Sequence, residues 1–383
     1  MPFADFGRKL KQRQLTRIVL LAAVWCTSLF EVSRRVFGLD GRISYETLRQ
    51  AVMSQLPSLE RLERELNRAL IEPFKRSRRL RRIAKQPCEI AIDTTLRPYH
   101  GRHHRDPREI VRGLPKAGTS HFHAYATAYL IHKGARLTLA LRCVRLRETM
   151  NEVVRKLLAD VRAAGIRPRR VLLDRGFASV EVIRYLHHSR TPFVMPLVAR
   201  GKGVGGNRPW FNRKVSGCGE YTLTAADGHC ATVYVVASCR NRNGERGKHG
   251  RQALVYATWG VPYTSHKALR KIYRRRFGIE SSYRQAHQAW AKTSSRDPRL
   301  RLLYVALALI LRNVWWWLHV DALTPPCKGG RRVCLKSLRF STMLWWIAEI
   351  ASADPTFALL QSLPATAQTR SKSPFAGWEN LND

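Results

Sequence analysis

Acidic residues are scarce in this sequence. Of its 383 residues, 27 are Asp or Glu against 68 Lys or Arg, which gives a formal net charge of +41 at pH 7. Such an excess repels itself in the folded chain unless a polyanion neutralises it. The basic residues are spread along the chain rather than gathered in one tail. This distribution favours a long groove or a wrapped surface for nucleic acid over an anionic membrane surface.

The cysteine patterns of disulfide frameworks and zinc sites are also missing. The eight cysteines are scattered and none forms a Cys-x-x-Cys pair, which is typical of a reduced, cytoplasmic protein. A histidine-rich segment has no zinc-site spacing and no cysteine between its histidines, so loop or DNA contacts are the favoured interpretation. Its histidines are His100, His103, His104, His121 and His123. The Gly-rich run that begins at Gly201 lacks the Gly-Lys-Ser/Thr ending of a nucleotide-binding loop.

Long uninterrupted apolar runs are rare. The N-terminus shows no basic leader directly before an apolar region, so we expect no signal peptide. Ile18 to Phe30 is too short to cross a membrane. Leu302 to Val320 is long enough, but it contains Arg312 and Asn313, which favours a buried core helix over a membrane span. We therefore expect a nucleoid-associated cytoplasmic protein without a membrane partner, and a membrane protein built on this run is the alternative.

The order of predicted elements indicates an α/β fold. From Cys88 to Val198 the pattern reads strand, hairpin, helix, strand, helix, strand, which predicts a mixed sheet flanked by helices. Seven of the eleven residues from Lys75 to Lys85 are basic, which favours a segment that follows phosphates over a solvated linker. We expect five regions: a helical, DNA-binding region at 1–86, the first part of the core at 87–198, a β-rich insertion at 199–262, core helices at 263–320, and a helical region with a polar tail from Pro364 at 321–383.

Three carboxylates have unusual positions in these predicted elements. Asp93 ends or nearly ends the first predicted strand, and Asp174 follows the apolar run Val171–Leu173. Aspartate is unfavourable within strands, although at a strand end it is also common as a turn or helix-cap residue. Glu280 lies on a predicted helix from Tyr273 to His287.

The two faces of that predicted helix differ in chemistry. At about 100° per residue, one face is polar and the other is apolar and suited to core packing. The polar face holds Tyr273, Arg276, Glu280, Arg284 and His287, and the apolar face holds Ala268, Ile272, Ile279 and Ala286. A single Glu on such a helix is usually a paired surface charge, so the other two carboxylates decide its interpretation.

Together the three carboxylates suit metal-dependent phosphodiester chemistry. Two hard divalent cations about 3.5–4 Å apart need several carboxylate oxygens. Such a pair activates an attacking water or 3′-hydroxyl and stabilises the leaving oxygen. The cations also supply the positive charge that makes clustered carboxylates tolerable.

Three blocks of this sequence resemble the catalytic blocks of DDE transposases of the insertion-sequence-four type. They are Ile92-Asp-Thr-Thr, Leu173-Asp-Arg-Gly-Phe, and Tyr273-x2-Arg276-x3-Glu280. The resemblance covers roughly 88 to 320 and implies a ribonuclease-H-like core, often with a β-rich insertion before the Glu. It implies that Asp93, Asp174 and Glu280 hold Mg²⁺ or Mn²⁺, with two ions expected. It also implies that Tyr273 and Arg276 contact DNA near the transposon end.

The family pattern has Lys seven residues after the Glu, where this sequence has His287. A phosphate contact there is therefore pH-dependent, or is made by Arg284 on the same face. The expected partners are double-stranded DNA, as terminal inverted repeats and target, and a second copy of the chain in a homodimer. The alternatives are a DNA-binding protein that has lost catalysis and another ribonuclease-H-like nuclease.

Overall fold

The computed structural model describes most of the chain. The described residues are 3–6, 10–37, 43–103, 105–132, 134–201, 206–241, 251–324, 326–327, 330–331 and 333–353. His104, Lys133 and the predicted polar tail from Pro364 lie outside them. The chain forms two compact units: one comprises Met1–Leu56, Ala291–Thr293 and Leu344–Asp383, and the other Pro57–Trp290 and Ser294–Met343. The boundary after Leu56 falls inside the region 1–86 that the sequence groups together, and we describe each unit by itself.

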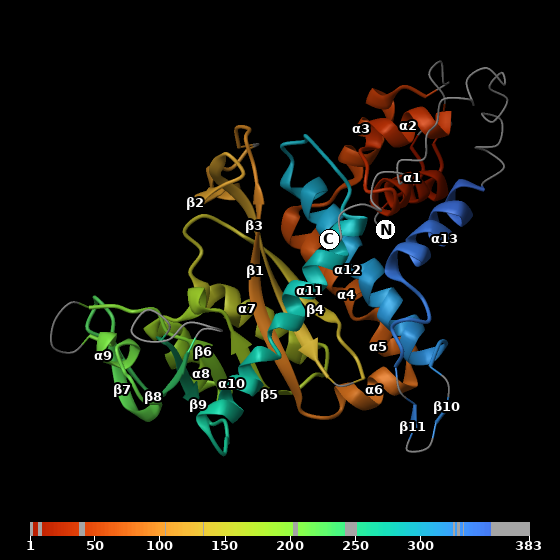
Figure 1. The fold of residues 1–383 in the computed structure, drawn as a ribbon. Coiled ribbons are helices and arrows are strands. Elements are labelled where there is room, and N and C mark those ends of the chain that lie inside the picture. Colours follow the sequence, from red (N-terminus) through yellow and green to blue (C-terminus); the bar gives the residue numbers. More distant parts are fainter. Residues whose placement is uncertain are drawn as a thin grey trace. The chain divides into compact units, whose positions relative to one another are not determined.

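The larger unit is built on one mixed sheet (Figure 1). The strands run in the order β2-β3-β1-β5-β6-β9-β8-β7, and β4 pairs with β3. Their bounds are β1 Cys88–Pro98, β2 Val111–Lys116, β3 Thr119–Ile131, β4 Thr138–Val144, β5 Pro168–Leu173, β6 Phe193–Pro196, β7 Gly217–Thr224, β8 Cys230–Asn241 and β9 Arg251–Trp259. Strands β1, β5 and β6 are parallel and the other pairs are antiparallel. The expected mixed sheet is confirmed.

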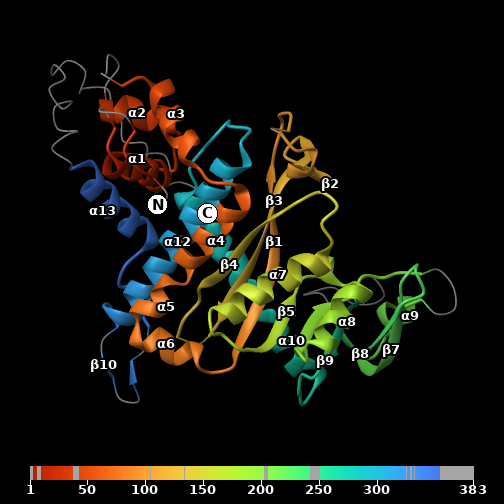
Figure 2. The ribbon, with the colours of Figure 1, turned by 180° about the vertical axis from the view of Figure 1, so that it is seen from behind.

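Helices cover both faces of this sheet. Figure 1 shows α10 and α11 in front of the strands, and the reverse view in Figure 2 shows α7 and α8 in front of them. The parallel strands are therefore enclosed on both sides. This explains why β5 is apolar from Val171 to Leu173. The helices of this unit are α4 Leu59–Leu70, α5 Glu72–Arg76, α6 Arg78–Ala84, α7 Met150–Ala163, α8 Val180–His188, α9 Arg208–Phe211, α10 His266–Arg274, α11 Phe277–Ala286 and α12 Pro298–Asp321.

The strands of the predicted β-rich insertion join the central sheet. Strand β9 pairs antiparallel with β6, from Phe193 opposite Trp259 to Pro196 opposite Tyr256. Strands β8 and β7 then continue the sheet outward. The insertion therefore extends the hydrogen-bonded sheet of the core. The sequence also missed β2, which lies in the segment interpreted as a polar loop.

Helix α12 is the central core helix of the larger unit. It is the one described helix that is long and apolar enough to cross a membrane, yet 78% of its most apolar window is buried inside the protein. The two polar residues in the middle of its apolar run are hydrogen-bonded: Arg312 donates to the hydroxyl of Tyr129 (2.9 Å), and Asn313 bonds both backbone groups of Thr138. This is the buried core helix that the sequence favours.

The basic segment Lys75–Lys85 is helical and partly packed. The Ser77 hydroxyl donates to Asp321 (2.7 Å), and Arg79 donates to the carbonyl of Val320. Leu80 is fully buried. The segment is therefore attached to the C-terminal end of α12, and its remaining basic side chains face solvent.

The smaller unit contains three N-terminal helices: α1 Gln12–Val24, α2 Leu29–Phe37 and α3 Tyr45–Gln55. The chain bends by 118° between α1 and α2. Cys26 lies in this bend with φ of 51°, which interrupts the helix. Helix α13, Phe340–Ser352, belongs to this unit from Leu344 onward. Its Trp345 and Trp346 are 59% and 48% exposed.

Candidate active site

Two of the three predicted carboxylates lie where the parallel pairing of β1 and β5 ends. The last parallel partners are Ile92 and Leu173, so Asp93 and Asp174 each follow one member of that pair. Strand β1 itself continues to Pro98 because it stays paired with β3. Asp93 is thus inside its strand, which corrects the prediction that it ends or nearly ends it. Asp174 stands at the start of the 3₁₀ turn Arg175–Phe177, as the sequence pattern indicates.

The helix predicted from Tyr273 to His287 is broken before Glu280. Helix α10 ends at Arg274 and α11 begins at Phe277. Across the break the amides bond to carbonyls three residues back, as in Arg276 N–H to Tyr273 O (2.9 Å) and Ile279 N–H to Arg276 O (2.9 Å). This tighter winding directs Tyr273 and Arg276 toward the sheet. Both are 6% exposed, which differs from the solvent-facing polar face expected of one continuous helix.

One guanidinium brings the three carboxylates together. Arg276 Nη1 lies 3.2 Å from Asp93 Oδ2, and its Nη2 lies 2.9 Å from Glu280 Oε1 and 3.6 Å from Asp174 Oδ1. Segments far apart in the sequence thus meet at one point above the sheet. The three predicted catalytic carboxylates form one cluster in the structure.

The cluster is electrostatically strained at Asp93. Burial, together with the nearby carboxylates of Asp174 and Glu280, raises the pKa of this carboxyl to about 6, although Arg276 and the Thr94 amide oppose the rise. The Thr94 N–H donates to Asp93 Oδ1 at 2.9 Å. A concentration of negative charge in a half-buried setting calls for additional positive charge.

The donor set fits a divalent cation of the hard type. Its ligating atoms are all carboxylate oxygens, the ligands that Mg²⁺ and Mn²⁺ prefer. Within the described ranges, no three His, Cys, Asp or Glu side chains already stand in a ready-made metal-binding arrangement. At this cluster the carboxylates are instead spaced around the guanidinium of Arg276.

Supporting residues that the sequence did not single out hold the cluster in place. The Tyr283 hydroxyl bonds the Thr127 hydroxyl (2.6 Å) and donates to the backbone carbonyl of Asp93 (3.4 Å), which ties α11 to β1 and β3. Glu89, buried on β1, accepts from Arg170 (2.7 Å) and from Arg275 (2.9 Å) and so anchors the helix break to the sheet. A charged residue in the apolar run Cys88–Ile92 was the available signal for Glu89.

The predicted DNA-contacting residues differ in exposure. Tyr273 is buried and packs against Tyr256, with ring centroids 5.1 Å apart, and Arg276 is buried in the cluster. Arg284 and His287 are exposed. The His287 ring contacts Trp290 edge-on at 5.0 Å. The DNA contacts of all four residues stay predictions.

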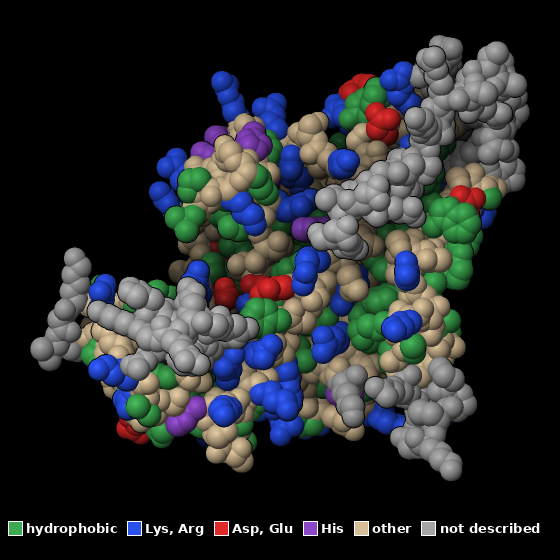
Figure 3. Space-filling model, viewed as in Figure 1, with side chains coloured by type: hydrophobic (Ala, Val, Ile, Leu, Met, Phe, Trp, Pro, Cys, Tyr) green, Lys and Arg blue, Asp and Glu red, His purple; other side chains and the backbone are tan. Residues whose placement is uncertain are grey.

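Basic groups surround the cluster. Arg97, four residues after Asp93 and on the same face of β1, lies 3.8 Å from the centroid of the Trp290 ring. Figure 3 shows a small acidic patch near α11, with Lys and Arg side chains on the surface around it. Histidines gather on the arm formed by β2 and the start of β3. The same face of the larger unit therefore combines a carboxylate cluster with a basic surround.

Comparison with known families decides the identity of this arrangement. Residues 84–314 match the family described as the transposase DDE domain. The chain belongs to this family. The matched segment contains the whole carboxylate cluster. The family is one of metal-dependent enzymes that cleave and rejoin the phosphodiester bonds of DNA, and the chain is a DNA transposase.

A solved structure supports the fold of this DDE transposase. The chain is similar to a piggyBac transposase solved by electron cryo-microscopy as a synaptic complex with hairpin DNA. The identity is 12%, the TM-score is 0.55, and the match covers 92% of this chain and 73% of that one. The mixed sheet flanked by helices is thus the ribonuclease-H-like sheet of a transposase. A search of curated proteins finds no significant match.

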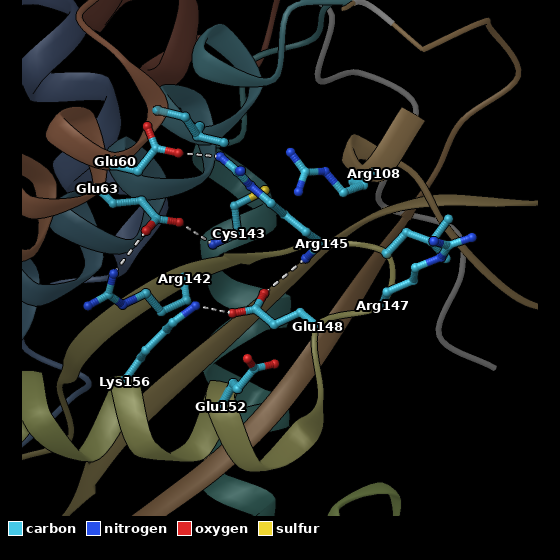
Figure 4. A pocket seen from close by; sticks show the side chains of 12 residues that line it. Glu60, Glu63, Arg108, Arg142, Cys143, Arg145, Arg147, Glu148, Glu152 and Lys156 are labelled. Carbon is cyan, nitrogen blue, oxygen red and sulfur yellow. Dashed lines mark hydrogen bonds and ion pairs between the residues drawn. The ribbon is translucent and has the colours of Figure 1, made fainter. Parts of the chain in front are cut away.

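A separate cavity of about 500 Å³ lies between α4, β4 and α7. Several of the side chains that line it form ion pairs, as Figure 4 shows. Glu63 accepts from Arg142 (3.0 Å) and from the Cys143 amide (2.6 Å), and Lys156 pairs with Glu148 (2.6 Å). Burial raises the pKa of Glu63, and its two donors oppose the rise. These pairs join the helices to the edge of the sheet, and we assign this cavity a structural role.

Proposed function

We propose that this DDE transposase is of the insertion-sequence-four type and mobilises an insertion sequence. It hydrolyses DNA at the transposon ends, and the freed 3′-hydroxyl then attacks target DNA. The observation that carries the proposal is the convergence of Asp93, Asp174 and Glu280 on one point beside a basic surface. The three blocks that hold these residues resemble the catalytic blocks of that type.

Asp93, Asp174 and Glu280 would together hold two Mg²⁺ or Mn²⁺ ions. Such ions supply Lewis-acid activation of the attacking oxygen and charge stabilisation at the leaving oxygen. The protein's own part is to fix the carboxylates. Asp93 is held rigidly by β1 and by the Tyr283 contact to its backbone, while Asp174 and Glu280 keep side chains that are 38% and 43% exposed. This openness leaves room for a DNA phosphate to approach.

Exposed basic side chains near the cluster would bind the DNA backbone. Arg284 and His287 extend along α11 and the turn after it, and Lys116 lies at the end of β2, near enough for its charge to act on His287. Tyr273 and Arg276 would reach DNA only after movement of the helix break, because both are buried. We further propose a homodimer on the terminal inverted repeats and a cytoplasmic, nucleoid-associated location.

The test of this function is cleavage of a duplex that carries the inverted repeats bracketing the reading frame. Asp93→Asn, Asp174→Asn and Glu280→Gln should each reduce cleavage below detection, because a two-ion site cannot form without its ligands. DNA binding, measured by fluorescence anisotropy, should remain largely intact. Glu181→Gln, an exposed change on α8, is the matched control and should cleave like the parent. Cleavage at the parental rate by any of the three variants would remove that residue from the catalytic set.

A further inference from the structure

A single cation serves all three carboxylates of the cluster. The Arg276 side chain is 7% exposed and contacts Asp93, Asp174 and Glu280 within 3.6 Å. The charged groups that act on Asp93 are these same residues: Arg276 lowers its pKa, and the other two carboxylates raise it. Among the described residues one positive charge therefore pairs with three acidic groups, which leaves the cluster with excess negative charge.

The contacts of Arg276 are incomplete. Its Nη2 makes a hydrogen bond to Glu280, whereas Nη1 meets Asp93 without hydrogen-bond geometry. Asp174 is the most distant of the three, at 3.6 Å. A planar guanidinium has a fixed fork, so it cannot align its donors with three carboxylates at once. The guanidinium is thus centrally placed but only partly bonded.

The Arg276 guanidinium lies between one buried and one exposed aromatic ring. The guanidinium carbon lies 5.7 Å from the ring centroids of both Tyr273 and Phe277. Tyr273 is buried, but Phe277 is 49% exposed. A rotation of the Arg276 side chain past Phe277 would carry its charge toward solvent and leave the space between the carboxylates. The position of Arg276 at a helix break, rather than mid-helix, favours such a movement.

We propose that Arg276 is an internal counter-cation that occupies the place where the catalytic metal ions bind and competes with them. This inference rests on the proposed function, in which the three carboxylates are the metal ligands. In the metal-free protein Arg276 keeps the carboxylates assembled against their mutual repulsion. Loading of the site requires the guanidinium to withdraw, so Arg276 lowers the affinity of the free protein for metal. Arg276 acts through the carboxylates and is a positioning residue.

The experiment measures Mn²⁺ binding to the full chain without DNA, by the electron paramagnetic resonance signal of free Mn²⁺ at mildly alkaline pH. Arg276→Gln should bind roughly tenfold more tightly or better, which corresponds to about 1.4 kcal/mol of relieved competition. Arg276→Lys should fall between, because an ammonium keeps the charge but lacks the fork. Arg155→Gln, an exposed change on α7, is the control and should bind Mn²⁺ almost as the parent does.

An anchoring role for Arg276 predicts the opposite sign. If Arg276 only holds the carboxylates in position, Arg276→Gln should bind Mn²⁺ as weakly as the parent or more weakly, and this result would overturn the inference. Thermal unfolding in EDTA checks that the variants fold. If Arg276→Gln does not fold, Arg276→Lys decides: Mn²⁺ binding tighter than that of the parent supports the counter-cation, and equal or weaker binding supports the anchor.

Asp93→Asn separates this inference from the proposed function. If Asp93→Asn loses Mn²⁺ binding but the Arg276 variants do not bind more tightly, the counter-cation role of Arg276 is rejected and the assignment of the metal ligands stands. Binding that does not change in Asp93→Asn rejects the ligand assignment, and with it both proposals.

Discussion

Asp93 is the most deeply buried of the three acidic groups, and its neighbours explain how the chain tolerates it. Its side chain is 11% exposed, against 38% for Asp174 and 43% for Glu280. An isolated carboxylate at this depth would be neutralised by protonation. The Thr94 amide and the Arg276 guanidinium offset part of this cost. The most deeply buried carboxylate of the three is thus stabilised by both a backbone amide and a guanidinium.

His287 stands where the family pattern has a permanent cation. In the free protein the pKa of its ring is lowered from the usual 6.5 by partial burial and by the positive charges of Arg97 and Lys116. Trp290 flanks the ring on the same turn. The ring is therefore mainly neutral near neutral pH, and a DNA phosphate beside it would raise its pKa.

The first prediction at this scale concerns the pH dependence of DNA binding. If the pKa of His287 is higher in the complex than in the free protein, binding takes up a proton, and affinity rises as the pH falls through 6.5 toward the lowered free-state value. His287→Lys should bind more tightly at neutral pH and should lose this pH dependence. Fluorescence anisotropy on a transposon-end duplex, measured across the pH range, gives both results. His287→Ala should weaken binding to ends more than to unrelated duplex.

The control for added charge is His229→Lys, on the exposed turn between β7 and β8. It should change affinity less than His287→Lys does and leave the pH dependence as in the parent. Arg284→Ala tests the rival contact. A parental affinity of His287→Ala together with weak binding by Arg284→Ala would assign the phosphate contact to Arg284.

At the scale of elements, the free edge of β4 is protected by helix side chains. Its outward amides donate to Asn313 on α12 (Thr138 N–H, 2.9 Å), to Asn67 on α4 (Leu141 N–H, 2.8 Å) and to Glu63 on α4 (Cys143 N–H, 2.6 Å). Asn313 also donates to the carbonyls of Thr138 (2.7 Å) and Leu70 (3.0 Å). An exposed strand edge invites wrong pairing with another chain. The polar residues of the apolar helix therefore act as a cover for this edge.

The second prediction is that Asn313→Leu destabilises the fold. The residue is fully buried, and leucine would leave buried amide and carbonyl groups of Thr138 and Leu70 without partners. An unsatisfied buried polar group costs about 1–3 kcal/mol, so we expect a loss of roughly 3 kcal/mol or more in the free energy of unfolding. Urea denaturation followed by tryptophan fluorescence measures it.

A matched change on the same helix is Val314→Leu, at a half-buried position. It alters size without removing a hydrogen bond and should cost less than Asn313→Leu. Equal stability of Asn313→Leu and the parent would show that the edge of β4 does not depend on this side chain.

At the scale of the whole molecule, the net charge of +41 dominates. Each phosphate that a basic side chain neutralises releases counterions, and the slope of log K against log[NaCl] changes by about −0.9 per contact on duplex DNA. A protein with this excess should therefore bind DNA with a steep salt dependence. A flat dependence would contradict a nucleic-acid function.

The third prediction is that basic residues on the arm formed by β2 and β3 contribute to this salt dependence. The double change Arg112→Gln with Lys116→Gln removes two exposed charges at this arm and should make the slope shallower by roughly 2. The control is Arg155→Gln with Arg184→Gln, on α7 and α8, which cover the opposite face of the sheet (Figure 2). If the control pair changes the salt slope more, the DNA-binding surface lies on that opposite face.

Much of the fold was predictable because local patterns agreed with it. Ser179 predicts the start of α8 and Gly165, with φ of 75°, the end of α7; both are observed. Strand β2 was not predictable, since its exposed residues lack an apolar face and it forms only by pairing with β3. The break between α10 and α11 was not predictable either, because the run from Tyr273 to His287 contains no proline.

The sequence by itself determined that this chain carries a large positive charge, and it singled out three acidic residues within or beside apolar elements, because composition and local pattern can be read without the fold. It thereby determined the residue set of the candidate site. Only the tertiary structure decided that Asp93 and Asp174 lie side by side, because that depends on the register of β1 against β5. It also decided that Arg276 turns inward to the carboxylates, since its direction depends on a helix break that long-range contacts such as Arg275 to Glu89 hold in place.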